Sequence, residues 1–150
     1  VSEYKAGAIT IEELTETFFS EFPHDWPLTW FDREIFQVFG MNVYETAFNQ
    51  SVGFKIYEND IIRMLVVRFE NLNSEGLDAI KTFTGFKKLE FISENKTEDK
   101  LHSDIYKEFL ERAVFPESYI KKMYENDFTR YFYTLEEIDE FKNKWASNFK

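Results

Sequence analysis

The sequence predicts an α/β domain that is mostly helical, with about six helices around one short β-hairpin. In several segments apolar residues recur every three or four positions, which is the spacing of one helical face. Two strand-like runs separated by a short turn occur within residues 53–69. The chain has 150 residues, 43% hydrophobic and 19% aromatic, enough for one sizeable core. We therefore expect residues 1–150 to form a single domain.

Two helices are predicted before the hairpin. Thr10 and Glu13 stand at the spacing of a capping box and open the first helix, which Pro23 ends. The apolar residues of this segment fall on one helical face: Ile11, Leu14, Phe18 and Phe22. The second helix is predicted to start at residue 27 or 29 and to end at residue 39, before Gly40.

The predicted hairpin pairs residues 53–57 with residues 61–69 around a turn at 58–60. Its second run is apolar almost throughout, which is typical of a strand covered on both faces. Arg68 and Glu70 follow this run and lie on one face of an extended strand, so they could form an ion pair. Two interpretations stay open: they are part of a site at the end of the sheet, or they stabilise the fold. The structural interpretation is favoured, because ion pairs at the ends of elements are common without chemistry.

Four further helices are predicted after the hairpin. A short helix is capped near Asn73 or Ser74 and closed by Gly85, and residues 87–95 look extended or irregular. An amphipathic helix reaches residue 114, and another runs from Pro116 to about residue 125. A second capping box, Thr134 with Glu137, opens the last helix. Its residues predicted to face inward are Leu135, Ile138, Phe141 and Trp145.

The composition of the chain disfavours several classes of partner and site. The chain has 18 basic and 28 acidic residues, for a net charge of -10, which disfavours nucleic acids and anionic membrane surfaces. There is no cysteine, which removes disulfides, thiolate catalysis and cysteine zinc sites. No apolar stretch is long enough to span a membrane or to form the core of a signal peptide at residues 1–10. We expect a cytoplasmic location.

His24 and His102 are the two histidines, and either could act as a general base near neutral pH. Asp25 follows His24 and could orient its imidazole. Packing within the proline-rich loop is the favoured role of His24, because no nucleophile or metal partner is spaced with it. Two scattered histidines without cysteine are too few for a zinc site, so no metal is expected.

Basic and aromatic side chains supply the remaining candidates. The residues that could hold a sulfate, a phosphate or an acidic glycan are Lys96, Lys100, Lys121, Lys122 and Arg130. Acidic residues flank each of them, which favours a solvated surface. The aromatic residues that could stack on sugar rings are Trp26, Trp30, Phe31, Tyr131 and Tyr133. Their helical spacing and the nearby prolines favour core packing instead.

Residues 68–72 resemble a stretch of the P-loop sulfotransferases. In that family a buried strand ends in Arg-Tyr-Glu-Asp-Leu, and a helix ending in Leu-Gly follows. The corresponding residues here are Arg68, Phe69, Glu70, Asn71 and Leu72, with two conservative changes.

A longer resemblance covers roughly residues 10–146. Four stretches occur in an order similar to that of the bacterial capsular polysaccharide synthesis proteins: FPHDWPLTWFDREIFQVFGMNVYE, MLVVRFENLN, DKLHSDIYKEF and YFYTLEEIDEFKNKW. That sulfotransferase-like family is named for an Asn-Lys-Trp-Tyr-Ser signature. The matching segment here is residues 99–103, in which Lys100 and Ser103 are kept.

The resemblance implies sulfuryl transfer from phosphoadenosine phosphosulfate to a hydroxyl of a polysaccharide acceptor. The family's donor site needs a glycine-rich loop that cradles phosphate, and none of the five glycines builds one. The sequence therefore resembles the C-terminal half of the fold, and we expect a partial domain, inactive alone, that lacks a cofactor unless such a loop lies upstream. The alternative is a non-catalytic helical binding or scaffold module.

The sequence thus offers a set of site candidates and one expectation about assembly. The catalytic candidates are His24, Arg68, Glu70 and His102, and the ligand-binding candidates are Lys96, Lys100 and Ser103. If residues 61–69 belong to a larger sheet, their other edge is unpaired. Open edges recruit partners, so we expect a homo-oligomer or a covering helix.

Overall fold

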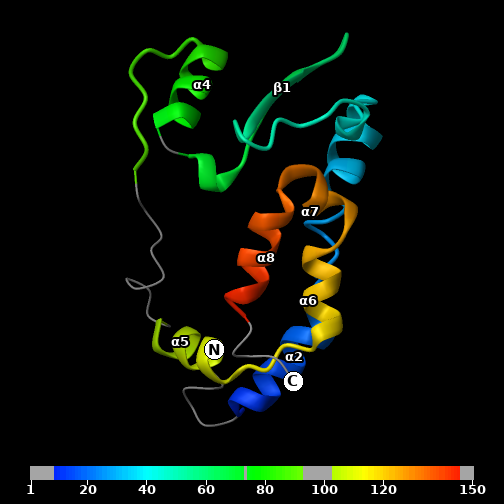
Figure 1. The fold of residues 1–150 in the computed structure, drawn as a ribbon, viewed down its shortest axis with the longest axis vertical. Helices are drawn as coiled ribbons and strands as arrows, with labels where there is room; N and C mark the ends of the chain where they lie inside the picture. The colour runs from blue at the N-terminus through cyan, green and yellow to red at the C-terminus, as the bar shows by residue number, and fades with distance from the viewer. Residues whose placement is uncertain (1–8, 73, 93–102, 146–150) are drawn as a thin grey trace.

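The computed structural model describes residues 9–72, 74–92 and 103–145, and within them the fold is mostly helical with one two-stranded antiparallel sheet (Figure 1). In chain order the elements are α2 (Ile11–Glu21), a π-helical segment (Phe31–Phe36), α3 (Gln37–Phe39), a 3₁₀ turn (Val43–Glu45), β1 (Phe54–Glu58), β2 (Arg63–Val67), a second 3₁₀ turn (Phe69–Asn71), α4 (Ser74–Thr84), α5 (Ser103–Arg112), α6 (Glu117–Tyr124), α7 (Asp127–Phe132) and α8 (Leu135–Asn143). The predicted class, helices around a short hairpin, is confirmed. None of the helices in these described ranges combines the length and apolar character needed to cross a membrane.

Both predicted capping boxes are present. The Thr10 hydroxyl accepts a hydrogen bond from the Glu13 backbone N–H at 3.2 Å, and the Glu13 carboxylate accepts one from the Thr10 N–H at 2.7 Å. Thr134 and Glu137 repeat this arrangement at the start of α8. Each box satisfies two of the backbone N–H groups that a helix start leaves unpaired.

The predicted second helix is less regular than expected. Residues 31–36 are wound as a π-helix, and α3 adds one turn before Gly40. Gly40 has φ +65°, a left-handed conformation that closes the helix as predicted. Phe31 and Ile35 are buried, whereas Trp30, Phe36 and Val38 are exposed.

The hairpin forms, but β2 is shorter and less buried than predicted. Phe54 pairs with Val67 and Glu58 with Arg63, whereas Ile61 and Phe69 are 69% and 82% exposed. The expectation of cover on both faces was wrong in degree, because Arg63 is exposed and the rest of β2 is only half-buried. No third strand pairs with it among the described residues. Self-association through its edge stays a prediction.

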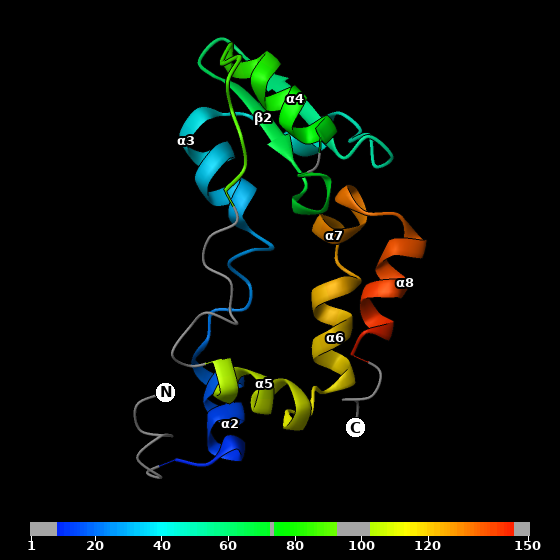
Figure 2. The ribbon, with the colours of Figure 1, turned by 90° about the vertical axis from the view of Figure 1, so that its left-hand side faces the viewer.

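Two aromatic-rich clusters form the core. The first contains Phe31, Ile35, Met41, Val43, Phe48, Tyr57 and Phe132. The second contains Ala113, Phe115 and Ile120, against which Phe18, Phe19, Phe109, Tyr119, Tyr124 and Trp145 pack. Figures 1 and 2 show the hairpin and α4 at one end of the molecule and α2 with α5 at the other. Helices α6 and α8 contact each other between these two ends.

The C-terminal region differs from the prediction in two respects. A short helix, α7, lies between α6 and α8 and was not expected; Asn126 caps it by accepting a hydrogen bond from the Thr129 N–H at 2.9 Å. Leu135 is 68% exposed rather than inward, because the first residue of α8 lies outside the packed face. Ile138 is buried as predicted, and Trp145 is half-buried with its ring 5.1 Å from that of Phe115.

Replacing Trp145 with alanine should lower the free energy of unfolding by about 3 kcal/mol, the lower end of the range for truncating a large aromatic side chain. The lower end applies because Trp145 is half-buried. Leu135→Ala is the control, with an expected change within about 0.5 kcal/mol because Leu135 is exposed. Urea unfolding measures both values. Equal stability of the two variants would show that Trp145 does not anchor the C-terminal region.

Candidate functional site

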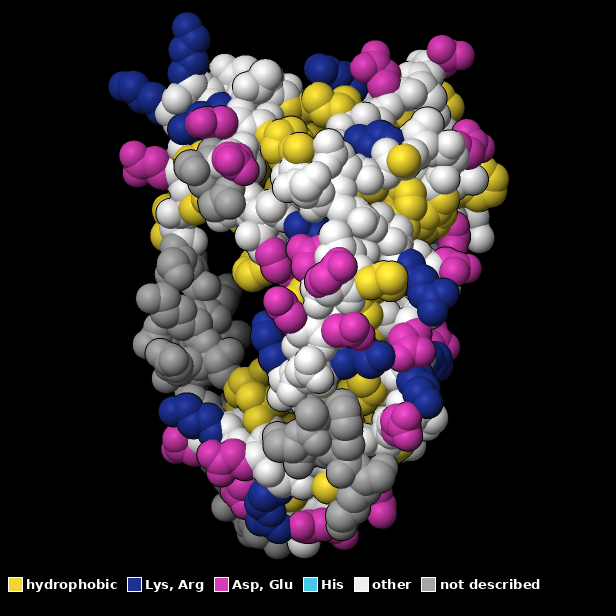
Figure 3. All heavy atoms as spheres, in the orientation of Figure 1, with side chains coloured by type: hydrophobic (Ala, Val, Ile, Leu, Met, Phe, Trp, Pro, Cys, Tyr) yellow, Lys and Arg dark blue, Asp and Glu magenta, His cyan; other side chains and the backbone are white. Residues whose placement is uncertain are grey.

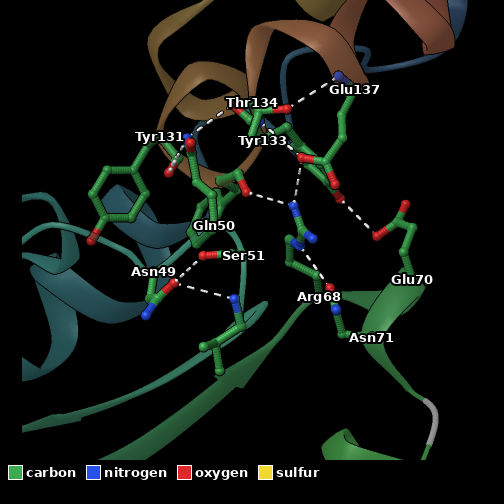
Figure 4. A network of polar contacts seen from close by, with 12 residues as sticks. Asn49, Gln50, Ser51, Arg68, Glu70, Asn71, Tyr131, Tyr133, Thr134 and Glu137 are labelled. Carbon is green, nitrogen blue, oxygen red and sulfur yellow. Dashed lines mark hydrogen bonds and ion pairs between the residues drawn. The ribbon is translucent and has the colours of Figure 1, made fainter.

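Arg68 lies at the centre of a buried polar network where β2 ends (Figure 4). Its side chain is 6% exposed. Its Nη1 donates to the Phe132 carbonyl at 3.0 Å and pairs with Glu137 Oε2 at 2.9 Å. Its Nε donates to Asn71 Oδ1 at 2.8 Å, and its guanidinium lies 5.0 Å from the centre of the Tyr133 ring. The network therefore joins the hairpin to the end of α7 and the start of α8.

Local backbone geometry sets the position of Arg68. Its N–H donates to the Gly53 carbonyl at 2.8 Å, next to the Phe54–Val67 pair of the hairpin. Gly53 has φ +75°, and a Cβ there would lie 2.0 Å from Asn71 Oδ1. Only glycine therefore allows Asn71 to come close enough to accept from Arg68.

Glu137 has two roles in this network. Its Oε2 accepts from the Thr134 N–H at 2.9 Å, closing the capping box, and also pairs with Arg68. Burial alone would raise the pKa of Glu137, but the hydrogen bonds from Arg68 and from the Thr134 backbone outweigh it and lower that pKa below its usual value. The ionised form of Glu137 is thus part of the folded structure.

Arg68 and Glu70, which could have formed an ion pair, have other partners in the structure. Directly after β2 the backbone enters the 3₁₀ turn Phe69–Asn71, so the strand geometry that would align the two side chains is lost. Glu70 instead accepts a hydrogen bond from the Tyr133 hydroxyl at 3.1 Å. Burial, followed by the charge of Glu70, raises the pKa of Tyr133 to about 12, so this phenol stays protonated. Glu70 itself is exposed.

His24 packs inside the second cluster. Its Nε2 lies 2.7 Å from the Phe18 carbonyl and its Nδ1 lies 3.0 Å from the Tyr119 hydroxyl, so both nitrogens are engaged. Asp25 does not orient the imidazole, because its carboxylate pairs with Lys122 at 2.6 Å. This geometry agrees with the packing interpretation of His24.

The other sequence candidates are dispersed. Lys96, Lys100 and His102 lie outside the described residues, and Ser103 is the first residue of α5. Lys121 pairs with Glu117 at 2.8 Å, and Arg130 is exposed on α7. No group of three or more acidic or histidine side chains that could hold a metal occurs in the described part of the chain.

The aromatic residues proposed to stack on sugar rings also lie in different parts of the fold. Phe31 is buried in the first cluster, and Tyr131 packs against it. Trp26 and Trp30 are 60% and 47% exposed. Tyr133 lines a pocket beside the Arg68 network.

Two pockets of about 350 Å³ each lie along α6. The first pocket is lined by Glu70, Met123, Tyr124, Thr129, Tyr133, Phe141, Lys144 and Trp145. The second pocket is lined by Phe18, Tyr106, Phe109, Leu110, Phe115, Tyr119, Ile120, Met123, Tyr124 and Trp145. Sequence reasoning assigned Phe141 and Trp145 to the core and missed Tyr124 and Lys144. The aromatic spacing of residues 119, 124, 141 and 145 is the signal that could have found this region.

Arg68→Ala should lower the free energy of unfolding by about 3–5 kcal/mol, because it breaks a buried ion pair and leaves the Phe132 carbonyl without this donor. Arg63→Ala is a matched control at the other end of β2. The Arg63–Glu58 pair spans 3.3 Å but is more than half exposed, so its loss should cost about 0–1 kcal/mol. Urea unfolding compares the two variants. A similar decrease in the free energy of unfolding for both variants would show that the buried Arg68 network stabilises the fold no more than an exposed ion pair does.

The low pKa of Glu137 predicts a pH-dependent stability difference between the wild type and Glu137→Gln. A carboxylate with a lowered pKa stabilises the fold above its unfolded pKa of about 4.3, and this contribution is lost as pH falls through the lower folded pKa. The difference should therefore be largest at pH 7 and shrink below about pH 4 in unfolding measurements. Glu136→Gln, at an exposed position, is the control. A pH-independent difference would contradict this assignment.

Comparison with known proteins identifies the family. A family model described as "Putative capsular polysaccharide synthesis protein" matches residues 7–134. No curated protein matches the chain significantly. No solved structure matches it significantly either. The matched segment includes the hairpin, the Arg68 network up to Thr134 and all of α6. Because the model covers most of its length, the chain belongs to this capsular polysaccharide synthesis family.

Proposed function

We propose that this chain acts in capsular polysaccharide synthesis by binding a glycan in the first pocket, and that Arg68 serves the fold rather than the chemistry. The family assignment supports the pathway. The observation that carries the second part is the burial of Arg68, with its donors directed at Asn71, Phe132 and Glu137. With Nε and Nη1 engaged and the side chain only 6% exposed, this guanidinium favours a structural role over the binding of a sulfate or phosphate group.

The first pocket has the composition of a sugar site. Its volume, about 350 Å³, falls in the range of ligand pockets. Tyr124, Phe141 and Trp145 line it with aromatic rings, the kind of side chain on which a pyranose ring packs. Glu70 is exposed and can accept hydrogen bonds from sugar hydroxyls, and Lys144 can donate them.

Charge favours neutral or amino sugars over acidic ones. The net charge of -10 repels anionic glycans at long range. Figure 3 shows acidic and basic side chains intermixed over the face formed by α6 and α8, with hydrophobic side chains between them. A glycan that carries hydroxyl, acetamido or amino groups fits this surface better than a polyuronate.

Sulfuryl transfer is the second candidate function, supported by the sulfotransferase-like pattern of residues 68–72. In that reaction a base removes the proton of the acceptor hydroxyl as the hydroxyl oxygen attacks the sulfur of phosphoadenosine phosphosulfate. The bond between sulfur and the donor's phosphate oxygen breaks, and adenosine 3′,5′-bisphosphate leaves. Glu70, which lines the first pocket, is the described carboxylate best placed for that role. The donor would have to be held by groups outside the Arg68 network.

Titration with hexose, N-acetylhexosamine and hexuronic acid tetrasaccharides tests the proposed function. We expect a neutral or N-acetylated glycan to bind, and Glu70→Gln to weaken that binding several-fold because a hydrogen-bond acceptor loses its charge. Glu58→Gln, on the distant hairpin, is the matched control. No binding to any member of the panel, or preferential binding of the hexuronate, would overturn the proposal.

Calorimetry with phosphoadenosine phosphosulfate separates the two candidate functions. We expect no tight binding of this donor to the chain alone. A dissociation constant in the low micromolar range, weakened by Lys100→Ala, would instead establish the sulfotransferase alternative.

A further inference from the structure

We propose that the natural ligand is a glycolipid, with its sugar in the first pocket and its alkyl chain in the second. This inference rests on the proposed glycan-binding function and adds the chemical class of the ligand. It depends on the adjacency of the two pockets and on the difference in their linings.

The two pockets are separated by a single wall of side chains. Met123, Tyr124 and Trp145 line both pockets. The Trp145 indole N–H donates to the Tyr124 hydroxyl at 3.0 Å, which fixes the two rings relative to each other. The two pockets are therefore adjacent, and the proposed ligand would lie across these shared residues with one end in each pocket.

The two linings differ in chemistry. The first pocket includes Glu70, Lys144 and the Thr129 side chain. Among the described residues that line the second pocket, none is charged, and Phe109, Phe115 and Ile120 are typical of it. This contrast fits a ligand that is polar at one end and apolar at the other.

The tyrosine hydroxyls of the second pocket do not alter its apolar character. The Tyr119 hydroxyl is engaged with His24 Nδ1 at 3.0 Å, and the Tyr124 hydroxyl accepts from Trp145. Burial raises the pKa of Tyr119, so this phenol stays neutral. Tyr106 is 49% exposed and marks the side of the pocket that faces solvent. These rings offer their faces to a ligand, which suits an alkyl chain rather than a second sugar.

Alkyl β-maltosides of increasing chain length, used below their micelle concentrations, test the inference against maltose alone. The affinity should rise by up to about fourfold for each methylene that is fully buried, which corresponds to about 0.8 kcal/mol per methylene. We expect at least a tenfold gain from maltose to octyl maltoside. NMR titration that follows the Trp145 indole N–H reports on the shared wall.

One variant in each pocket tests which pocket holds which end of the ligand. Tyr106→Ser should remove most of the gain from the alkyl chain while leaving maltose binding unchanged. Glu70→Gln should weaken maltose and octyl maltoside by the same factor. Leu135→Ser, also at an exposed apolar position, is the control and should change neither affinity.

The outcomes distinguish this inference from the proposed function. An affinity independent of chain length would overturn the glycolipid inference but leave glycan binding intact. Equal affinity for 1-octanol and octyl maltoside would also overturn it, because the sugar would then not be recognised. Failure of maltose and of every tetrasaccharide to bind would instead overturn the proposed function itself.

Discussion

The buried guanidinium of Arg68 is the interaction on which the arrangement of this fold depends. A charge removed from water is strongly destabilising unless it is paired and hydrogen-bonded. Here Asn71, Phe132 and Glu137 accept hydrogen bonds from its Nε and Nη1, and they come from three different elements. The hairpin end, the end of α7 and the start of α8 must therefore meet in one geometry (Figure 4).

Contacts from the hairpin region explain why α7 is helical in the fold although it has only six residues. Helices this short are not stable alone, and their last carbonyl groups lack partners within the helix. Gln50 Nε2 lies 2.9 Å from the Arg130 carbonyl, 3.3 Å from that of Tyr131 and 2.9 Å from that of Tyr133. Arg68 supplies the donor for the carbonyl between them, that of Phe132. Side chains from the hairpin region thus cap α7 from a distance in sequence.

The separation of two contacting residues along the chain decides whether the sequence could predict their contact. The capping boxes at Thr10 and Thr134 involve residues three positions apart, so their pattern is readable in the chain itself. The partners of Arg68 lie as far as 69 residues away in the sequence, and the local sequence pattern does not indicate Glu137 as one of them. Helix α7 was missed although its cap residue, Asn126, is local, because the donors to its last carbonyl groups, Gln50 and Arg68, are distant in sequence. Glu70 was identified as a candidate, but its neighbour in the fold is Tyr133 rather than Arg68.

Aromatic residues form much of the core and also line the two pockets. Rings are rigid and pack edge to face, as Phe18 and Phe109 do with centroids 5.5 Å apart. The second cluster borders a pocket, and Tyr124 and Trp145 line both this pocket and the next one. The Arg68 network meets this region through Tyr133, which packs on the guanidinium and bonds to Glu70. The buried arginine can therefore affect a ligand only indirectly, by fixing Tyr133 and Glu70 at the edge of the first pocket, where a sugar would contact them.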